Sequence, residues 1–221
     1  MPICQIKFGG EDYIGLFGFA TDSYCLVSNR LSKNKYDRLA RCLEVDIIPT
    51  TVSAFSLSGV MSAGNSNGVA VPYMVTDSEI EEISKAVKKV KVVPDRFTAL
   101  GNLVAANDKG GVISDVFSAE AKEVIDSALG FETVQRKIGG SSEVGALCVA
   151  TNKGFVVTPD ASDKEMEELK GIFGVEGGRA SANMGSKAVG CCIIANSNGF
   201  AAGEATTPIE LGLINEALGF L

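Results

Sequence analysis

The chain has 221 residues, and its 20 basic and 27 acidic side chains give a formal net charge of −7, with no histidine at all. The missing histidine excludes the Ser–His and Cys–His catalytic pairs and removes the commonest metal ligand, so we expect neither a metal site nor a cofactor. An acidic chain also lacks the broad basic face that binding to nucleic-acid phosphates requires.

The N-terminal residues lack the charged and apolar regions of a secretion signal. The longest apolar stretches, such as residues 188–195, are too short to span a bilayer. The six cysteines form no C-x-x-C pair, so we expect buried, reduced thiols. These features predict a cytoplasmic protein that makes no contact with a membrane.

Five glycines recur at spacings of 44, 42, 44 and 45 residues and mark five similar units. These anchor glycines are Gly15, Gly59, Gly101, Gly145 and Gly190. A strand-like run precedes each anchor, at residues 2–8, 45–52, 90–97, 131–138 and 175–180. After each anchor, two apolar runs flank a turn rich in Asn and Gly. The pattern predicts a β-hairpin in every unit, with the first strand directly after the anchor.

A helix is predicted after each hairpin. A hydroxyl residue stands seventeen positions after every anchor: Ser32, Thr76, Ser118, Ser162 and Thr207. Three of the five are followed three residues later by glutamate, which is the spacing of a capping box: Glu79, Glu165 and Glu210. Apolar pairs four residues apart then give each helix one buried stripe.

The five units account for the whole chain as a single domain of pseudo-symmetric repeats, approximately 1–44, 45–89, 90–130, 131–174 and 175–221. Such units stack linearly or close into a ring. An open stack usually needs atypical capping repeats at its ends, and none is visible here. We therefore expect a five-fold α/β propeller, with strands around a central axis and helices outside.

Few residues stand out as functional candidates. Most carboxylates lie on the polar faces of the predicted helices. Cys191 and Cys192 read as part of a packed strand directly after an anchor. Basic residues gather in the first helix, where a solvated face is the default reading and limited contact with RNA phosphate is the alternative. They are Arg30, Lys33, Lys35, Arg38 and Arg41.

The residues that follow the anchors break the symmetry of the repeat. They are Leu16, Val60, Asn102, Ala146 and Cys191. Four are apolar and one is an amide. Because a buried amide must be hydrogen-bonded, Asn102 is either a satisfied core group or a contact displayed at the rim of the ring.

Residues 98–110, Thr-Ala-Leu-Gly-Asn-Leu-Val-Ala-Ala-Asn-Asp-Lys-Gly, resemble the third repeat of the translation initiation factor 6 family in its archaeal form. Residues 13–17, 144–154 and 189–199 resemble the same family, and the resemblance extends over essentially the whole chain. It implies a pentein-type ring and a non-enzymatic, monomeric factor. Such a factor binds the large ribosomal subunit, prevents joining of the small subunit, and has a role in large-subunit maturation. The implied contact is a ribosomal protein beside the sarcin–ricin loop, with limited contact to rRNA.

The resemblance also implies positions at the ribosomal interface. Asn102 matches the interface asparagine of the family, and Gly15 matches a glycine whose replacement loosens the fold or the binding. Val60 and Leu147 depart from eukaryotic members, which often have Arg and Tyr there, so a more apolar surface is expected. The candidate ribosome-binding residues are Asn102, Val60, Leu16, Ala146, Leu147 and Cys191.

Two other classes stay open. Pentein-fold enzymes that modify guanidine groups use Cys, His and a carboxylate, and the absence of histidine argues against an enzyme of this kind. A different protein–protein adaptor built from the same repeat is the remaining alternative.

Overall fold

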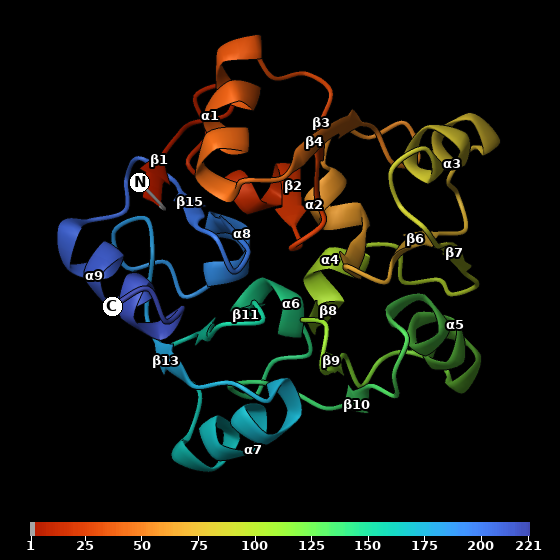
Figure 1. Ribbon diagram of the computed structural model, residues 1–221. Helices are drawn as coiled ribbons and strands as arrows, with labels where there is room; N and C mark the ends of the chain where they lie inside the picture. The colour runs from red at the N-terminus through yellow and green to blue at the C-terminus, as the bar shows by residue number, and fades with distance from the viewer. Residues whose placement is uncertain (1–2) are drawn as a thin grey trace.

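The computed structural model describes residues 3–221 and contains five three-stranded sheets arranged around a common centre (Figure 1). Four of the five sheets are each built from a succession of one short helix, two hairpin strands, one long helix and a third strand. The first succession is η1 (Ile14–Phe17), β2 (Gly18–Ala20), β3 (Tyr24–Ser28), α1 (Lys33–Leu43) and β4 (Asp46–Thr50).

The other units repeat this order. The second is α2 (Ser58–Met61), β5 (Ala63–Asn65), β6 (Gly68–Pro72), α3 (Asp77–Ser84) and β7 (Val90–Val93). The third is α4 (Leu100–Leu103), β8 (Val104–Ala106), β9 (Gly111–Ile113), α5 (Ala119–Leu129) and β10 (Val134–Gln135). The fourth is α6 (Val144–Leu147), β11 (Cys148–Ala150), β12 (Phe155–Val157), α7 (Asp163–Phe173) and β13 (Gly177–Arg179). The last has α8 (Val189–Cys192), β14 (Ile193–Ala195), β15 (Phe200–Ala202) and α9 (Pro208–Ala217).

The predicted hairpin is present in every unit, and its second strand pairs in parallel with a third strand. In the first sheet, Gly18 pairs with Val27 across the hairpin, and Tyr24 pairs with Asp46 of β4. The last sheet differs because its third strand is β1 (Ile3–Gln5), which pairs in parallel with β15. The first residue of the run predicted at 2–8 lies outside the described residues. The N-terminal strand therefore completes the sheet of the last hairpin.

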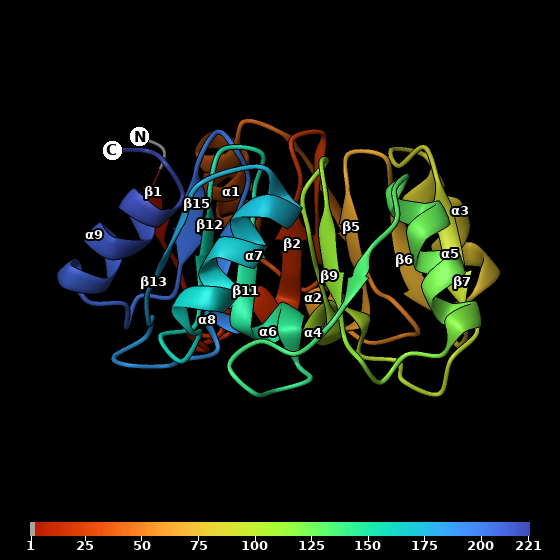
Figure 2. The same cartoon turned by 90° about the horizontal axis from the view of Figure 1, so that it is seen from below.

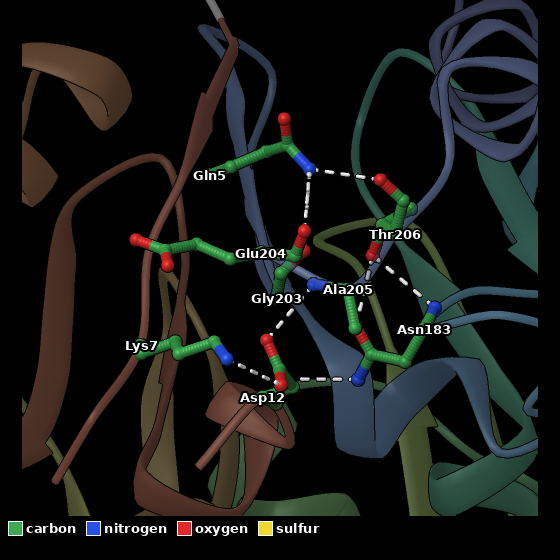
Figure 3. A network of polar contacts seen from close by, with 8 residues as sticks. All are labelled: Gln5, Lys7, Asp12, Asn183, Gly203, Glu204, Ala205 and Thr206. Atoms are coloured by element: carbon green, nitrogen blue, oxygen red, sulfur yellow. Dashed lines mark hydrogen bonds and ion pairs between the residues drawn. The ribbon is translucent and has the colours of Figure 1, made fainter. Parts of the chain in front are cut away.

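Side-chain hydrogen bonds fasten this junction between the two ends of the chain (Figure 3). The Gln5 amide donates to the backbone oxygen of Thr206 at 2.8 Å, and an Asp12 carboxylate oxygen accepts from the backbone N–H of Ala205 at 2.9 Å. The Asn183 amide also donates to the backbone oxygen of Asp12 at 2.9 Å. The segment before the first anchor is thus bonded to the last unit at several points.

The predicted capping boxes are confirmed at Thr76, Ser162 and Thr207. Their glutamates do more than cap. The Glu79 carboxylate accepts from the backbone N–H groups of Ser53 and Ala54, at 3.0 and 2.8 Å. Both residues have positive φ, 56° and 63°, in the tight turn that precedes α2. Each such glutamate therefore ties the tight turn before a short helix to the long helix of the same unit.

The anchor glycines explain the short helices. Each was expected to lead directly into a strand, but residues 14–17, 58–61, 100–103, 144–147 and 189–192 are helical, and the strand begins afterwards. Cys191 and Cys192 consequently lie in α8, and not in a strand. A Cβ atom on any anchor glycine would meet the carbonyl oxygen of a neighbouring anchor well within 3.0 Å. The chain turns tightly here because five backbones meet at the centre.

Candidate interaction surface

The short helices lie together at one end of the molecule, as Figure 2 shows for α2, α4, α6 and α8. We call this end the short-helix face, formed by residues 14–17, 58–61, 100–103, 144–147 and 189–192. The first hairpin strand of each unit starts from this face, so the hairpin turns reach the opposite end. On this face, each anchor glycine contacts the anchor of the preceding unit, and Gly15 of the first unit contacts Gly190 of the last.

The structure brings all six predicted ribosome-binding residues onto the short-helix face. Each one is half-buried, with part of its side chain exposed. They are Leu16, Val60, Asn102, Ala146, Leu147 and Cys191. Five of these six side chains are apolar, and Asn102 is the exception.

Asn102 differs from the other five because its side chain is an amide, which can donate and accept hydrogen bonds. Its backbone N–H donates to the Ala99 oxygen at 3.0 Å, which is a bond of the helical turn. Its side-chain amide makes no hydrogen bond to any residue in 3–221. An amide with an unused donor and acceptor on a half-exposed face is available to a partner. Of the two alternatives left open by the sequence, a hydrogen-bonded core group does not agree with this geometry.

Sequence reasoning missed a group of exposed apolar side chains in the segments before the short helices. Tyr13 and Leu57 stand two residues before their anchors and are 41% and 36% exposed. Phe55 and Met184 lie in the neighbouring tight turns and are 50% and 78% exposed. The only signal was an apolar residue in a turn-like segment, and such residues are common on surfaces. All four lie in segments that lead into the short helices.

The hairpin turns at the opposite end use their polar side chains internally. The buried Asn65 amide donates to the backbone oxygens of Asn107 and Leu129, at 3.0 and 2.9 Å. Asn107 and Asn196 make the same pair of bonds to the next hairpin and to the end of a long helix. These amides hold adjacent units together, so they are not available to a partner.

Asp22 and Asp108 lie in hairpin turns at the same end, and both accept hydrogen bonds from neighbouring hairpins. The Asn152 amide donates to carboxylate oxygens of both, at 2.8 and 2.6 Å. Asp108 also accepts from the Ser66 N–H at 2.7 Å, and Asp22 accepts from Ser197. The two carboxylates therefore connect units.

A small cavity of about 90 Å³ runs along the centre between the two ends. Its lining is mostly Gly, Ala and Val, and Cys148 is the only titratable residue in it. Burial raises the pKa of the Cys148 thiol, and burial also raises the pKa of Cys192 to about 11. Thiols with raised pKa values are poor nucleophiles at neutral pH. Within residues 3–221 no group of three or more Cys, Asp or Glu side chains could hold a metal ion.

Comparison with known proteins gives the family. The eIF-6 family model matches residues 3–217. Translation initiation factor 6 of Pyrococcus horikoshii is 40% identical over the full length of both chains. The same factor from Methanosarcina mazei is 37% identical over 94% of each chain. The chain belongs to the eIF-6 family. The resemblance seen in the sequence is thereby confirmed, and the family assigns the chain to translation.

Solved structures also match this eIF-6 family chain. Among them, dimethylarginine dimethylaminohydrolase aligns with 94% of this chain and 74% of its own, at 10% identity and a TM-score of 0.48. In the described part of the chain, no helix is long and apolar enough to cross a membrane.

Proposed function

We propose that this eIF-6 family member binds the large ribosomal subunit through its short-helix face and blocks joining of the small subunit. The observation that carries the proposal is the free Asn102 amide, displayed among half-buried apolar side chains on one face. Buried apolar anchors around a few placed polar groups are the usual composition of a protein-binding surface. At the opposite end, the amides of the hairpin turns are hydrogen-bonded within the protein, so they are not available to a partner.

The partner that fits is a basic ribosomal protein beside the sarcin–ricin loop. A net charge of −7 favours the approach of a basic partner and disfavours broad binding to rRNA. The same binding on a maturing subunit gives the factor a role in large-subunit assembly. The protein acts as a monomer in the cytoplasm, where subunits join.

The architecture proposed for this role is a pentein-type propeller of five repeats, with approximate limits at residues 44, 89, 130 and 174. Two features support closure of the ring. The N-terminal strand β1 pairs with the last hairpin strand β15, and Gly15 contacts Gly190. A rigid disc suits a factor that acts by occupying a surface, because it obstructs the small subunit without a moving part.

The role is non-enzymatic. A guanidine-modifying enzyme on this architecture needs a thiolate and a base, and the chain has no histidine while its central thiol has a raised pKa. An adaptor for some other protein is the remaining alternative, and the assay below separates it from the proposal.

The test is co-sedimentation with purified archaeal ribosomal subunits, followed by a subunit-joining assay on sucrose gradients. The protein is expected to pellet with large subunits and not with small ones, and to reduce the peak of joined ribosomes in proportion to the bound fraction. A protein that pellets with neither subunit, or that binds without reducing joining, contradicts the proposal. Lysozyme at the same concentration controls for trapping of protein in the pellet.

A further inference from the structure

Helix α1 and the loop before it form a basic segment on an acidic protein. Residues 30–44 contain five basic and two acidic side chains, a balance of +3, whereas the whole chain carries −7. The basic residues are Arg30, Lys33, Lys35, Arg38 and Arg41. Helix α1 lies on the outside of the molecule (Figure 1). Its charge therefore faces the surroundings and is the opposite of the net charge elsewhere.

Three of these cations are free to bind a partner. Arg38 donates to the backbone oxygen of Gln5 at 2.5 Å, and Arg41 donates to the backbone oxygen of Asp37 at 3.1 Å. Arg30, Lys33 and Lys35 make no ion pair or side-chain hydrogen bond within residues 3–221. We call these three residues the basic rim.

Basic residues elsewhere are commonly neutralised by carboxylates. Lys122 lies 2.6 Å from Asp126, and Arg136 lies 2.6 Å from Glu168. Lys85 and Lys170 are paired in the same way with glutamates of their own helices. The basic rim therefore differs from most cations of residues 3–221 in lacking a charged, hydrogen-bonded or aromatic partner, a property that it shares with Lys88 and Lys91.

The start of α1 adds to this positive charge. The first turn of α1 contains no acidic residue, and Ser32 makes no capping hydrogen bond. The other four long helices begin with a hydroxyl cap and at least one acidic residue. Since a helix N-terminus carries a partial positive charge, the field at the start of α1 has the same sign as the charge of the rim.

The basic rim borders the short-helix face. The backbone oxygen of Thr50 accepts from the N–H of Asn29 at 3.2 Å and from the Ser58 hydroxyl at 3.0 Å. Asn29 directly precedes Arg30, and Ser58 begins α2, which carries Val60. A ligand that covers the face near Val60 therefore comes within reach of long side chains at the rim.

We propose that the basic rim binds phosphates of ribosomal RNA at the edge of the surface on which the short-helix face docks. This inference rests on the proposed function and adds the residues that make the RNA contact and their location beside the short-helix face. RNA is the partner that fits the rim, because its phosphates pair with separate, flexible cations such as these three side chains. A basic ribosomal protein would be repelled by the rim. The rim therefore binds RNA, and the acidic remainder of the protein binds the basic ribosomal protein of the same subunit.

The test measures the affinity of the full chain for archaeal large subunits across a series of KCl concentrations. The variant Arg30→Gln/Lys33→Gln/Lys35→Gln is compared with Lys85→Gln/Lys122→Gln/Lys170→Gln, which loses the same charge at paired lysines. Each phosphate contact contributes about 0.7–0.9 to the slope of log K against log salt. The rim variant is therefore expected to lose about two to three units of slope, and the control variant is expected to match wild type. Both variants are first checked for an unchanged melting temperature.

A second arm separates RNA from an acidic protein partner. A fluorescein-labelled, GC-rich RNA hairpin and labelled poly-L-glutamate are each titrated with wild type and with the rim variant. If wild type binds the hairpin and the rim variant does not, the inference is supported. If wild type binds poly-L-glutamate more tightly than the hairpin, the inference is overturned. If wild type binds subunits and the rim variant keeps the full slope, the inference is wrong while the proposed function stands. If wild type binds no large subunit, the proposed function fails and the inference fails with it.

Discussion

Gly101 provides the sharpest test of the contacts at the centre of the molecule. A Cβ atom at this position would meet the carbonyl oxygen of Gly59 and would lie 2.8 Å from both the Gly59 carbonyl carbon and the Ser62 oxygen. All three are backbone atoms, so no rotation of a side chain relieves the overlap. Gly101→Ala must therefore displace the chain of the neighbouring unit.

The cost of this substitution follows from the packing. Adding one methylene to a well-packed site costs about 1–3 kcal/mol, and the upper end applies where backbone must move. One kcal/mol lowers the Tm of a domain of this size by about 2–4 °C. We expect Gly101→Ala to lower the Tm by about 6–12 °C, measured by circular dichroism or scanning calorimetry.

Gly171→Ala is the matched control. Gly171 is exposed in α7, and a Cβ there would have no neighbouring atom within 4 Å. Alanine favours a helix over glycine by about 0.5–1 kcal/mol, so this variant is expected to raise the Tm by about 1–4 °C. A loss smaller than about 2 °C for Gly101→Ala, or an equal loss for both variants, would refute the close approach of the anchor backbones.

Two further predictions concern the polar contacts between elements. Burial by itself raises the pKa of Glu210, but hydrogen bonds from Thr207, Ser181 and Gly185 outweigh it and lower the pKa to about 2. Because this folded pKa lies below the unfolded value, the carboxylate stabilises the fold above about pH 4.3, and this stabilisation is lost as the pH falls towards 2. Glu210→Gln should therefore lower the free energy of unfolding by about 3 kcal/mol at pH 7, and by progressively less at lower pH, in urea titrations. A loss of stability that does not change with pH would contradict this. Asn65→Ala removes two buried hydrogen bonds to Asn107 and Leu129 and should cost about 2–3 kcal/mol at neutral pH, whereas a cost below about 0.5 kcal/mol would show that the bonds do not hold the units together.

Much of the fold was readable from the sequence because the repeat presents each signal five times. The anchor spacing predicted the hairpins, and the hydroxyl residues at fixed distance predicted the starts of the long helices. The short helices were not predicted. Four-residue apolar segments such as 189–192 carry no periodicity that separates helix from strand. What sets these segments apart is a glycine contact with another unit, 42 to 45 residues away in sequence for four of the contacts and 175 residues away for Gly15 with Gly190.

The sequence singled out positions on the short-helix face, but it did not show which polar side chains there have partners. The position after each anchor drew attention to Asn102, yet only the structure shows that its amide is unbonded within residues 3–221 while the amides of Asn65, Asn107 and Asn196 are all hydrogen-bonded. The difference lies in long-range partners, which local sequence does not contain. The same holds for Glu79 and Glu210, whose second role is to hold turns about 25 residues earlier in the chain.

The dissociation constant of the Asn102→Ser variant for archaeal large subunits tests the central claim most directly. The variant replaces the displayed amide, and the loss of one hydrogen bond at a partner surface is expected to weaken binding about tenfold while the Tm stays within about 2 °C. Asn198→Ser, at the exposed opposite end, is the control and should leave the affinity unchanged. Wild-type affinity in Asn102→Ser, or an equal loss in both variants, would show that the short-helix face is not where the large subunit binds.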